Sequence, residues 1–377
     1  MGGSAPSDIS LMKLALRLAR RGYGRTSPNP MVGSVIVRKG RIIGRGWHHG
    51  AGQPHAEVEA INDARQHGFD PRGATLYVTL EPCCTHGRTP PCTEAILAAG
   101  IGRVVVAATD PNPAHAGRGF TILRSAGVEV AVGVLAGESA ALNAAFNHWI
   151  VHRTPWVVVK AALTLDGKIA TRIGESKWIT GPSARATAMF LRQGVDAILV
   201  GVNTVLSDDP GLTYRPARPQ AIKQPALRRF VLDSRGRTPL HSRVATDEFA
   251  SLTTVVVTDQ IPRPRLRALE RKVVVWVAPA RDGRVDLPWL LARLGQESVT
   301  SLLVEGGGQL LGAFLMAGLA HRLAFFFAPK IIGGRAAVPA VAGRGARDWR
   351  EVVRLKNPVW KSLGEDLWLT AGLEMSE

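Results

Sequence analysis

The sequence has few cysteines: Cys83, Cys84 and Cys92 are the only three in 377 residues, and they lie close together. So few thiols exclude a disulfide framework, and their clustering indicates a metal site or a reactive thiol. No stretch approaches eighteen consecutive apolar residues, which excludes a membrane-spanning helix. The N-terminus lacks the basic start, apolar run and cleavage site of a signal peptide. We therefore expect a cytoplasmic enzyme with no membrane partner.

Acidic residues are scarce relative to basic ones: 30 Asp and Glu against 47 Lys and Arg give a net charge of +17. This charge favours anionic partners such as nucleic acid, acidic lipid or small phosphates, but a generally arginine-rich composition explains it equally well. The chain is 46% hydrophobic and 20% charged, which excludes a disordered chain. Its length predicts two domains.

The first half of the chain alternates between helical and extended patterns. Residues 9–21 predict a helix packed on a core, with a basic membrane-surface helix as the alternative. A Lys39-Gly40 turn is expected between two paired strands. The further elements are strands at 32–37, 41–47, 74–80, 103–109 and 128–133, and helices at 54–67, 91–100 and 121–127. This alternation indicates a largely parallel sheet that is covered on both faces.

The segment Asn147–Pro155 is interpreted as a junction, because a new series of β-branched runs follows it. Helical segments at 184–194 and 309–318 alternate with these runs, and residues 215–229 form a proline-rich basic loop. The predicted strands are 156–163, 196–201, 228–233, 253–259, 273–278, 301–306 and 321–329. The second half is therefore a second α/β domain.

His55, Cys83 and Cys92 are the candidate metal ligands, because catalytic zinc usually has three protein ligands and one open position. Glu57 supplies a carboxylate that need not touch the metal. At about 100° per residue, His55 and Glu57 lie about 200° apart on a helix, so both reach one ion only at the helix N-terminus, where Pro54 begins the first turn. Cys92 also starts a helix, whose positive end lowers the pKa of the thiol.

A structural zinc site is the alternative, with Cys84 or His86 as a fourth ligand, but Glu57 then has no purpose. The pattern otherwise matches the zinc deaminase signature His-x-Glu…Pro-Cys-x-x-Cys, except that nine positions separate the two cysteines here. The main rival function is a nucleic-acid-binding base deaminase with an inactive second domain. Such a protein needs aromatic side chains for base stacking, and residues 48–100 contain only Phe69 and Tyr77.

Longer motifs resemble one family. GWHHGAGQPHAEVEA followed by LEPCCTHGRTPPC is similar to the bifunctional deaminase–reductases of riboflavin biosynthesis. The resemblance continues through SPNPMVG, TDPNP, GRGF, KAALTLDGKIA, GESKWITG, DAILVGVNTVLSDDPGLT, VLDS, VEGGGQLLGAFL and APKIIGG. It implies an α/β protein with a cytidine-deaminase-like three-layer domain at 1–150 and a dihydrofolate-reductase-like domain at 154–377.

The resemblance implies two consecutive reactions. Zinc-dependent hydrolysis removes an amino group from 2,5-diamino-6-ribosylamino-pyrimidinone 5'-phosphate, and NADPH then reduces the ribosyl group to a ribityl chain. The implied cofactors are Zn²⁺ and NADPH. The implied partner is a small phosphorylated pyrimidine, not nucleic acid, and we expect a homo-oligomer.

The resemblance also implies roles for individual residues. His55, Cys83 and Cys92 hold zinc, and Glu57 and Lys160 are catalytic. The substrate-binding positions are Asn29, His48, Arg88, Asp110, Asn112, Ser176, Arg192, Leu212, Arg215 and Glu305. The cofactor-binding positions are Ala162, Trp178, Thr204, Asp208, Ser234 and Gly307, Gly308, Gln309, Leu310, Leu311, Gly312, Ala313. One departure is that the family reads Ser-His after the first cysteine, whereas this chain has Cys84-Thr85.

Without the resemblance, several of these residues have simpler interpretations. Arg192 and Arg215 suit a bidentate phosphate contact, but each could be a solvated surface arginine. Lys160 could protonate an open-chain imine or be an ion-pair partner. In the same way, Trp178 fits core packing, Asp208-Asp209-Pro210 fits a capped turn, and Gly306-Gly307-Gly308 fits tight packing instead of a phosphate loop.

Overall fold

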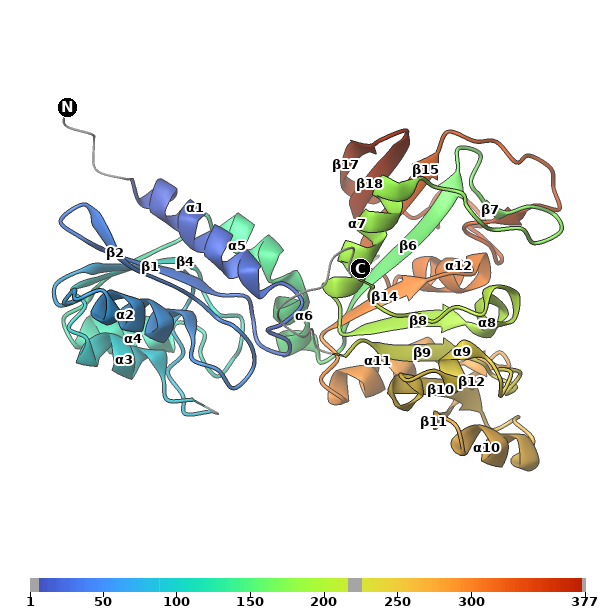
Figure 1. Cartoon of the computed structure of the whole chain (residues 1–377), viewed down its shortest axis with the longest axis horizontal. Coiled ribbons are helices and arrows are strands. Elements are labelled where there is room, and N and C mark those ends of the chain that lie inside the picture. The colour runs from blue at the N-terminus through green and yellow to red at the C-terminus, as the bar shows by residue number, and fades with distance from the viewer. Residues whose placement is uncertain (1–6, 88, 216–225, 375–377) are drawn as a thin grey trace. The chain divides into compact units, whose positions relative to one another are not determined.

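The computed structural model describes residues 7–87, 89–215 and 226–374, and it divides into two compact units. Unit 1 covers Met1–Arg153 and unit 2 covers Thr154–Glu377 (Figure 1). The boundary falls inside the predicted junction, but most of that junction is helical, because a helix continues to His152. Arg153, with a φ of 56°, ends this helix in the left-handed region.

Unit 1 contains a five-stranded sheet in the order β2-β1-β3-β4-β5. Its strands are β1 (Gly33–Arg38), β2 (Arg41–Trp47), β3 (Thr75–Leu80), β4 (Arg103–Ala108) and β5 (Glu129–Val132). Strand β1 is antiparallel to β2 and β3, whereas β3, β4 and β5 are parallel. The helices are α1 (Asp8–Ala19), α2 (Ala56–Gln66), α3 (Cys92–Ala98), α4 (Arg118–Ser125), α5 (Ala136–Leu142) and α6 (Ala144–His152).

Helices cover both faces of this sheet and give unit 1 three layers (Figure 1). On one face, α1 buries Leu11 and Met12 against the sheet, so it is a core helix and the membrane-surface interpretation is wrong. On the other face, α2, α3 and α4 contribute Ala60, Ile96 and Leu123 to a second cluster. Strands β3 and β4 are therefore apolar on both sides, as a doubly covered sheet requires.

Unit 2 contains a nine-stranded sheet in the order β11-β10-β9-β8-β14-β6-β15-β18-β17. The first seven of these strands are parallel to one another, and β18 and β17 close the other edge as antiparallel strands. The sheet strands are β6 (Trp156–Thr164), β8 (Ala197–Gly201), β9 (Arg228–Leu232), β10 (Thr253–Thr258), β11 (Val274–Ala278), β14 (Ser301–Glu305), β15 (Arg322–Ala328), β17 (Leu355–Leu363) and β18 (Asp366–Leu373).

Helices cover this sheet on both sides. Leu199 and its neighbours on alternate positions pack against α11 and α12, whereas Ile198 faces the opposite core. The helices are α7 (Pro182–Gln193), α8 (Val202–Asp208), α9 (Arg243–Thr246), α10 (Arg263–Glu270), α11 (Leu287–Gln296) and α12 (Gly308–Met316). Short strand pairs complete the unit: β7 (Lys168–Ala170) with β16 (Val338–Pro339), and β12 (Ala280–Arg281) with β13 (Arg284–Val285).

Unit 2 differs from the sequence-based expectation in loop 215–229 and in its C-terminal hairpin, because neither β17 nor β18 was predicted. The predicted loop 215–229 is too long, because β9 already begins at Arg228; its residues 216–225 lie outside the described part. Strand β17 was not predicted because it is exposed along almost its whole length and contains Pro358. A proline is tolerated there because β17 is an edge strand that needs no hydrogen bond on its outer side.

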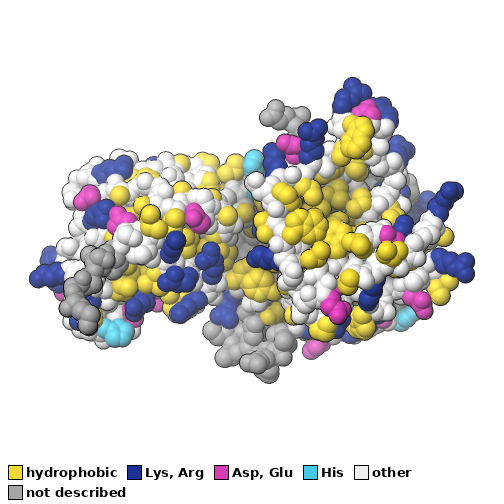
Figure 2. All heavy atoms as spheres, turned by 90° about the horizontal axis from the view of Figure 1, so that it is seen from above, with side chains coloured by type: hydrophobic (Ala, Val, Ile, Leu, Met, Phe, Trp, Pro, Cys, Tyr) yellow, Lys and Arg dark blue, Asp and Glu magenta, His cyan; other side chains and the backbone are white. Residues whose placement is uncertain are grey.

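The surface of unit 2 carries exposed apolar side chains over its antiparallel edge. Val359 and Trp360 of β17 are 48% and 54% exposed, and Leu355 is 40% exposed. Figure 2 shows hydrophobic side chains gathered on the face of unit 2 turned to the viewer, with Lys and Arg side chains around them. Within the described residues, no helix combines the length and apolar character needed to span a bilayer.

Candidate active sites

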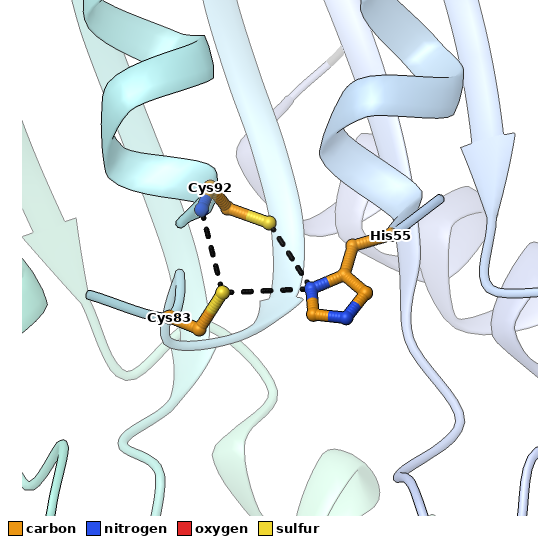
Figure 3. A group of neighbouring side chains, drawn as sticks. All are labelled: His55, Cys83 and Cys92. Carbon is orange, nitrogen blue, oxygen red and sulfur yellow. Dashed lines mark hydrogen bonds between the residues drawn. The ribbon is translucent and has the colours of Figure 1, made fainter. Parts of the chain in front are cut away.

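Three potential metal ligands meet in unit 1 where two helices begin (Figure 3). His55 is the N-cap of α2, Cys92 is the first residue of α3, and Cys83 lies in the loop after β3. His55 Nδ1 lies 3.2 Å from the Sγ of Cys92 and 3.5 Å from that of Cys83. The backbone N–H of Cys92 donates to Cys83 Sγ at 3.3 Å. The three ligand atoms all lie within 4.8 Å of one another, as the helix-start interpretation predicts.

Close packing on β2 determines where α2 begins. A Cβ at Gly46 would lie 2.3 Å from the carbonyl oxygen of Ala56 and 2.4 Å from the backbone nitrogen of Ala60. Only glycine lets the helix approach the strand this closely. The first turn of α2, which carries His55 and Glu57, is therefore held rigidly against the sheet.

The electrostatics of this cluster favour a cation. The Cys92 thiol donates a hydrogen bond to Cys83, and this bond, with a further contribution from His55, lowers the pKa of Cys83 to about 4. The same bond, together with burial, raises the pKa of Cys92, so the expected lowering of the Cys92 pKa by the helix start is wrong for the metal-free cluster. Glu57 is buried at 3% exposure. Burial first, and then the negative charge at Cys83, raises the pKa of Glu57 to about 7. A thiolate and a buried carboxyl thus lie beside one histidine, and this donor set fits zinc.

The two candidates for a fourth ligand point elsewhere. Cys84 Sγ lies 3.5 Å from Nδ1 of His115, and His86 is exposed, with its Nε2 3.9 Å from a carboxylate oxygen of Glu94. Among the described residues, the ligand cluster therefore has three members. Three protein ligands leave a position open for water, as in catalytic zinc sites, so the geometry disfavours a structural zinc.

Two predicted substrate residues of unit 1 lie beside the metal cluster. Asn29 Nδ2 is 3.1 Å from His48 Nε2, and the ring of His48 stands edge-on to that of His55 at 5.2 Å between centroids. Burial lowers the pKa of His48, whose Nδ1 is 3.1 Å from the carbonyl oxygen of Pro54. His48 therefore stays neutral at pH 7, with its Nε2 directed at the Asn29 amide.

The other substrate positions of unit 1 follow β4. The Asp110 carboxylate accepts a hydrogen bond from the backbone N–H of Asn112 at 2.8 Å, and burial raises the pKa of Asp110. Asn112 Oδ1 accepts in turn from the N–H of Ala114. Arg88 lies outside the described residues.

In unit 2, three predicted residues form one charged cluster. Arg192, in the last turn of α7, donates from Nε and Nη2 to the Glu305 carboxylate at 2.9 and 2.8 Å, and from Nη1 to the carbonyl oxygen of Thr213 at 2.9 Å. Lys160 Nζ is 3.5 Å from the same carboxylate, because Lys160 and Glu305 are register partners on β6 and β14. Burial alone would raise the pKa of Glu305, but the charges of Arg192 and Lys160 lower it to about 2.

The three predicted basic residues of unit 2, Arg192, Lys160 and Arg215, differ in burial and in their ion-pair partners. Arg192 is not a solvated surface arginine, because its side chain is 11% exposed and its guanidinium is engaged by Glu305. Its phosphate contact stays a prediction. Lys160 does form the ion pair that was one of its two interpretations. Arg215, by contrast, is exposed at the edge of the undescribed stretch.

Several predicted cofactor positions lie where parallel strands of unit 2 end. Gly306 and Gly307 link β14 to α12 with φ angles of 104° and 75°, which only glycine adopts readily. A Cβ at Gly306 would lie 3.1 Å from Thr204 Oγ1 in α8, the helix that follows β8. Ser176 Oγ donates to Asp208 Oδ1 at 3.0 Å. The carboxyl ends of parallel strands are where α/β folds bind ligands.

The remaining cofactor positions have varied surroundings. Trp178 is 68% exposed under the guanidinium of Arg185, whose Cζ lies 4.7 Å from the ring centroid, so the core interpretation of Trp178 is wrong. Ser234 Oγ, just after β9, accepts from the N–H of Val285 at 3.2 Å. Leu212, which was predicted to bind substrate, is buried with a φ of 49°. Ala162 is half-buried and packs beside α7.

The glycine run 306–308 before and at the start of α12 was interpreted either as tight packing or as a phosphate loop, and its members differ in why glycine is needed. A Cβ at Gly308 would lie 2.2 Å from the carbonyl oxygen of Pro339, which is the tight packing expected if the run is not a phosphate loop. Gly306 and Gly307, by contrast, are required because their positive φ angles are ones that other residues rarely adopt. Along the helix, Gln309 is exposed, Ala313 is half-buried, and the buried members are Leu310, Leu311 and Gly312.

Sequence reasoning missed two residues that hold these sites in place. Lys330 Nζ donates to the carbonyl oxygens of Trp178 at 2.9 Å and Ile179 at 2.7 Å, and its only signal was its position in APKIIGG. Glu81 is 3% exposed and accepts several backbone N–H bonds, although in the sequence it stands out only as part of LEPCC.

Comparisons with known proteins agree with both units. Residues 6–108 match the model of the cytidine and deoxycytidylate deaminase zinc-binding region, and residues 155–369 match the model of the RibD C-terminal domain. The chain is 45% identical to the riboflavin biosynthesis protein RibD of Actinobacillus pleuropneumoniae over 96% of this chain and 94% of that protein. It is 42% identical to RibD of Escherichia coli over 87% of this chain and 89% of that protein.

Solved structures give the same result. Acinetobacter baumannii RibD superposes with a TM-score of 0.86 at 36% identity, covering 97% of this chain and 99% of that one. A diaminohydroxyphosphoribosylaminopyrimidine deaminase/5-amino-6-(5-phosphoribosylamino)uracil reductase of Thermotoga maritima has a TM-score of 0.80 at 35% identity, covering 97% and 98%. The predicted fold class is confirmed. The chain therefore belongs to the RibD family of riboflavin biosynthesis, bifunctional enzymes that join a zinc-dependent deaminase to an NADPH-dependent reductase.

Proposed function

We propose that unit 1 deaminates 2,5-diamino-6-ribosylamino-pyrimidinone 5'-phosphate, with His55, Cys83 and Cys92 as the zinc ligands. The observation that carries this proposal is the convergence of the three ligand atoms within 4.8 Å, next to the buried Glu57. When bound, zinc supplies Lewis-acid activation of the water that attacks the aminated ring carbon. A histidine, two cysteines and a neighbouring carboxyl in this arrangement are the donor set and proton carrier of a zinc deaminase.

Glu57 is the proton carrier of this proposal. In the metal-free chain, burial and then the charge of Cys83 raise the pKa of Glu57 to about 7, and a buried carboxyl with a raised pKa suits general acid–base catalysis. One carboxylate oxygen accepts a proton from the attacking water and delivers it to the amino nitrogen that leaves as ammonia. Burial excludes bulk water from the carboxyl group, so the proton stays with the substrate.

The substrate is bound by residues around the metal cluster. Asn29 and His48 present an amide and a neutral imidazole beside His55, which suits the donor and acceptor edge of a pyrimidinone. Asp110 and Asn112 offer further polar atoms from the loop after β4. Arg88 is assigned to the 5'-phosphate on the resemblance alone.

We propose that unit 2 reduces the ribosyl group of the deaminated intermediate. When bound, NADPH supplies the hydride. Lys160 Nζ is held 3.5 Å from the Glu305 carboxylate, and in this proposal it donates the proton that the nitrogen of an open-chain imine takes up as the hydride reaches the carbon. The support is the position of Lys160, level with the last residue of β14, next to the Gly306-Gly307 turn and Thr204. Deaminase activity is thus assigned to residues 1–150 and reductase activity to 154–377.

NADPH preference is assigned to a basic surface near Ser234. Arg235 and Arg237 are exposed, and Arg237 Nη2 donates to Asn203 Oδ1 at 3.0 Å. One charge-assisted contact to the 2'-phosphate contributes about 1.5–3 kcal/mol, or roughly 10- to 150-fold in affinity. Replacing either arginine by alanine should therefore narrow the preference for NADPH over NADH, which steady-state kinetics with both nucleotides would measure.

The experiment that tests the proposal uses the full zinc-loaded chain. Without NADPH, the diaminopyrimidinone phosphate should release ammonia and yield the deaminated intermediate. With NADPH, that intermediate should be converted further as NADPH is oxidised. Glu57→Gln should block only the first step, whereas the matched change Glu59→Gln, on the same helix, should block neither. Ammonia release that survives Glu57→Gln would refute the assignment of the proton carrier.

We further propose a cytoplasmic homo-oligomer with no nucleic-acid partner. The cytoplasmic assignment is supported by a phosphorylated substrate and by NADPH, both of which are used inside cells. The oligomer is supported by the exposed apolar side chains of the β17 edge, Leu355, Val359 and Trp360. Light scattering should give a mass above one chain that falls towards it in Trp360→Glu. A single-stranded oligonucleotide should not inhibit deamination at physiological salt.

A further inference from the structure

A buried acid of unit 1 takes no part in the metal cluster. Glu81 follows β3 directly and stands two residues before Cys83, yet it is 3% exposed and is not among the clustered ligands. Its backbone N–H donates to the carbonyl oxygen of Ala108 at 2.9 Å, which joins the ends of β3 and β4. A buried carboxylate requires hydrogen-bond donors, and the identity of its donors indicates what it does.

The donors to Glu81 are backbone amides of the loop after β4 and of the first turn of α4. The N–H of Asp110 donates to Oε2 at 3.2 Å, and the N–H of Gly119 donates to Oε1 at 3.0 Å. The N–H of Gly117 is shared between the two oxygens at 3.0 and 2.9 Å. One carboxylate therefore holds both ends of segment 110–119, here called loop 110–119, which runs from the residues after β4 into the first turn of α4.

The sequence is shaped for this contact. A Cβ at Gly119 would lie 2.4 Å from the carbonyl oxygen of Pro82 and 3.1 Å from Glu81 Oε1. A larger residue there would push the loop away from the carboxylate. The GRGF motif thus has a physical reason that neither zinc binding nor proton transfer supplies.

The loop carries the residues assigned to the substrate. The N–H of Asn112 donates to the Asp110 carboxylate, and the N–H of His115 donates to the carbonyl oxygen of Asn112 at 2.9 Å. These bonds order the loop internally, and Glu81 joins it to the end of β3 in addition to the contact between His115 Nδ1 and Cys84 Sγ at 3.5 Å. Glu81 stands two residues before Cys83, so its carboxylate links the segment that carries a metal ligand to the loop that carries Asp110 and Asn112.

We propose that Glu81 is a positioning residue of the deaminase, whose carboxylate holds loop 110–119 so that Asp110 and Asn112 meet the pyrimidine substrate at the metal site. This inference rests on the proposed function of unit 1. It differs from a purely structural role in one respect: the loop can shift while the fold and the zinc ligands remain in place.

The test is Glu81→Gln in the full zinc-loaded chain. The glutamine NH₂ group is a donor, so it faces at least one backbone N–H without accepting its bond, and the loop must move. The KM for the diaminopyrimidinone phosphate should rise about 10-fold or more, with a smaller change in kcat. Zinc should remain near one equivalent, and reductase activity on the deaminated intermediate should be unchanged. Glu81→Asp, which keeps the charge, should restore part of the KM.

A second variant disturbs the same contact from the other side. Gly119→Ala leaves Glu81 intact but displaces the loop, so it should raise KM as Glu81→Gln does, and the double variant should be little worse than either single one. Glu94→Gln, an exposed acid on α3, is the matched control and should change nothing.

Three outcomes would overturn the inference: an unchanged KM in both loop variants, loss of zinc in Glu81→Gln, or an equal fall of deaminase and reductase activities. A wild-type chain that does not deaminate the substrate at all would instead refute the proposed function. If Glu81→Gln does not fold, Gly119→Ala is the test: a raised KM supports the inference and an unchanged KM refutes it.

Discussion

Two buried glutamates, one in each unit, have opposite electrostatic surroundings. Glu57 and Glu305 are 3% and 8% exposed, yet the pKa of Glu57 is raised to about 7 and that of Glu305 is lowered to about 2. Burial acts in the same direction on both carboxyl groups. The difference comes from their neighbours, which are a cysteine thiolate beside Glu57 and two cationic side chains around Glu305.

The contrast separates two kinds of site. Around Glu57 the protein supplies two cysteines and a histidine, a donor set that a metal ion completes. Around Glu305 the protein supplies its own cations, Arg192 and Lys160, and the charge is already compensated. A carboxyl that exchanges protons near pH 7 suits acid–base catalysis, whereas one that stays ionised suits the orientation of a lysine.

The largest expected effect is loss of the metal. Cys92→Ser or Cys83→Ser removes a thiolate ligand, so elemental analysis should fall from about one zinc per chain to near zero, and deamination should be lost. Cys84→Ser is the matched control, because Cys84 Sγ faces His115, and it should retain the zinc. If Cys84→Ser empties the site, the three-ligand assignment is wrong.

The next effect concerns the proton carrier. Glu57→Gln keeps the size of the side chain but cannot transfer protons, so kcat for deamination should fall at least ~10²-fold. Zinc content and the reduction of the deaminated intermediate should stay at wild-type values. Ammonia release measures the deaminase activity and NADPH oxidation measures the reductase activity, and both are to be measured on the same preparation. A parallel loss of the two activities would contradict separate sites.

The two glutamates should also differ in their effect on stability. Glu305→Gln leaves the charges of Arg192 and Lys160 without their carboxylate, so the free energy of unfolding of unit 2 should drop by about 3 kcal/mol. In zinc-free protein, Glu57→Gln removes an acid that is strained when ionised and should leave stability unchanged or raise it. Denaturant titration of both variants makes the comparison. If zinc-free Glu57→Gln also lost several kcal/mol of unfolding free energy, the proposed difference between the two glutamates would be wrong.

The metal cluster could be predicted from sequence because its determinants are local. Pro54 and Pro91 mark two helix starts, and a histidine and a cysteine beside them need little further information to be placed. The strand runs of β6, β8 and β14 were equally clear, because β-branched residues in a doubly covered parallel sheet leave a continuous apolar pattern.

The contacts that could not be predicted depend on which strands pair and in which register, and a single sequence does not reveal either. Lys160 and Glu305 are paired because β6 and β14 are neighbours with that register, and nothing near either residue indicates it. The bonds from Glu81 to loop 110–119 likewise arise only when β3 and β4 pair. Strand β17 has little apolar alternation because both of its faces are exposed, so the edge hairpin gave no usable pattern.

The smallest expected effect is the pH dependence of stability, and it has opposite signs in the two units. Glu305 has a folded pKa of about 2 against 4.5 in the unfolded chain, so its contribution is full above pH 4.5 and is lost as pH falls towards 2. The slope is at most about 1.4 kcal/mol per pH unit.

Glu57 has a folded pKa of about 7 in metal-free protein, against 4.5 in the unfolded chain. Its ionisation therefore lowers the free energy of unfolding as pH rises from 4.5 through 7. Subtracting the unfolding free energy of each Glu→Gln variant from that of the wild type at each pH isolates each group. The difference for Glu305 should shrink between pH 5 and 3, and the difference for Glu57, in chelator-treated protein, should decline between pH 5 and 7. Slopes of the same sign would mean that burial, and not the neighbouring charges, controls both carboxyl groups.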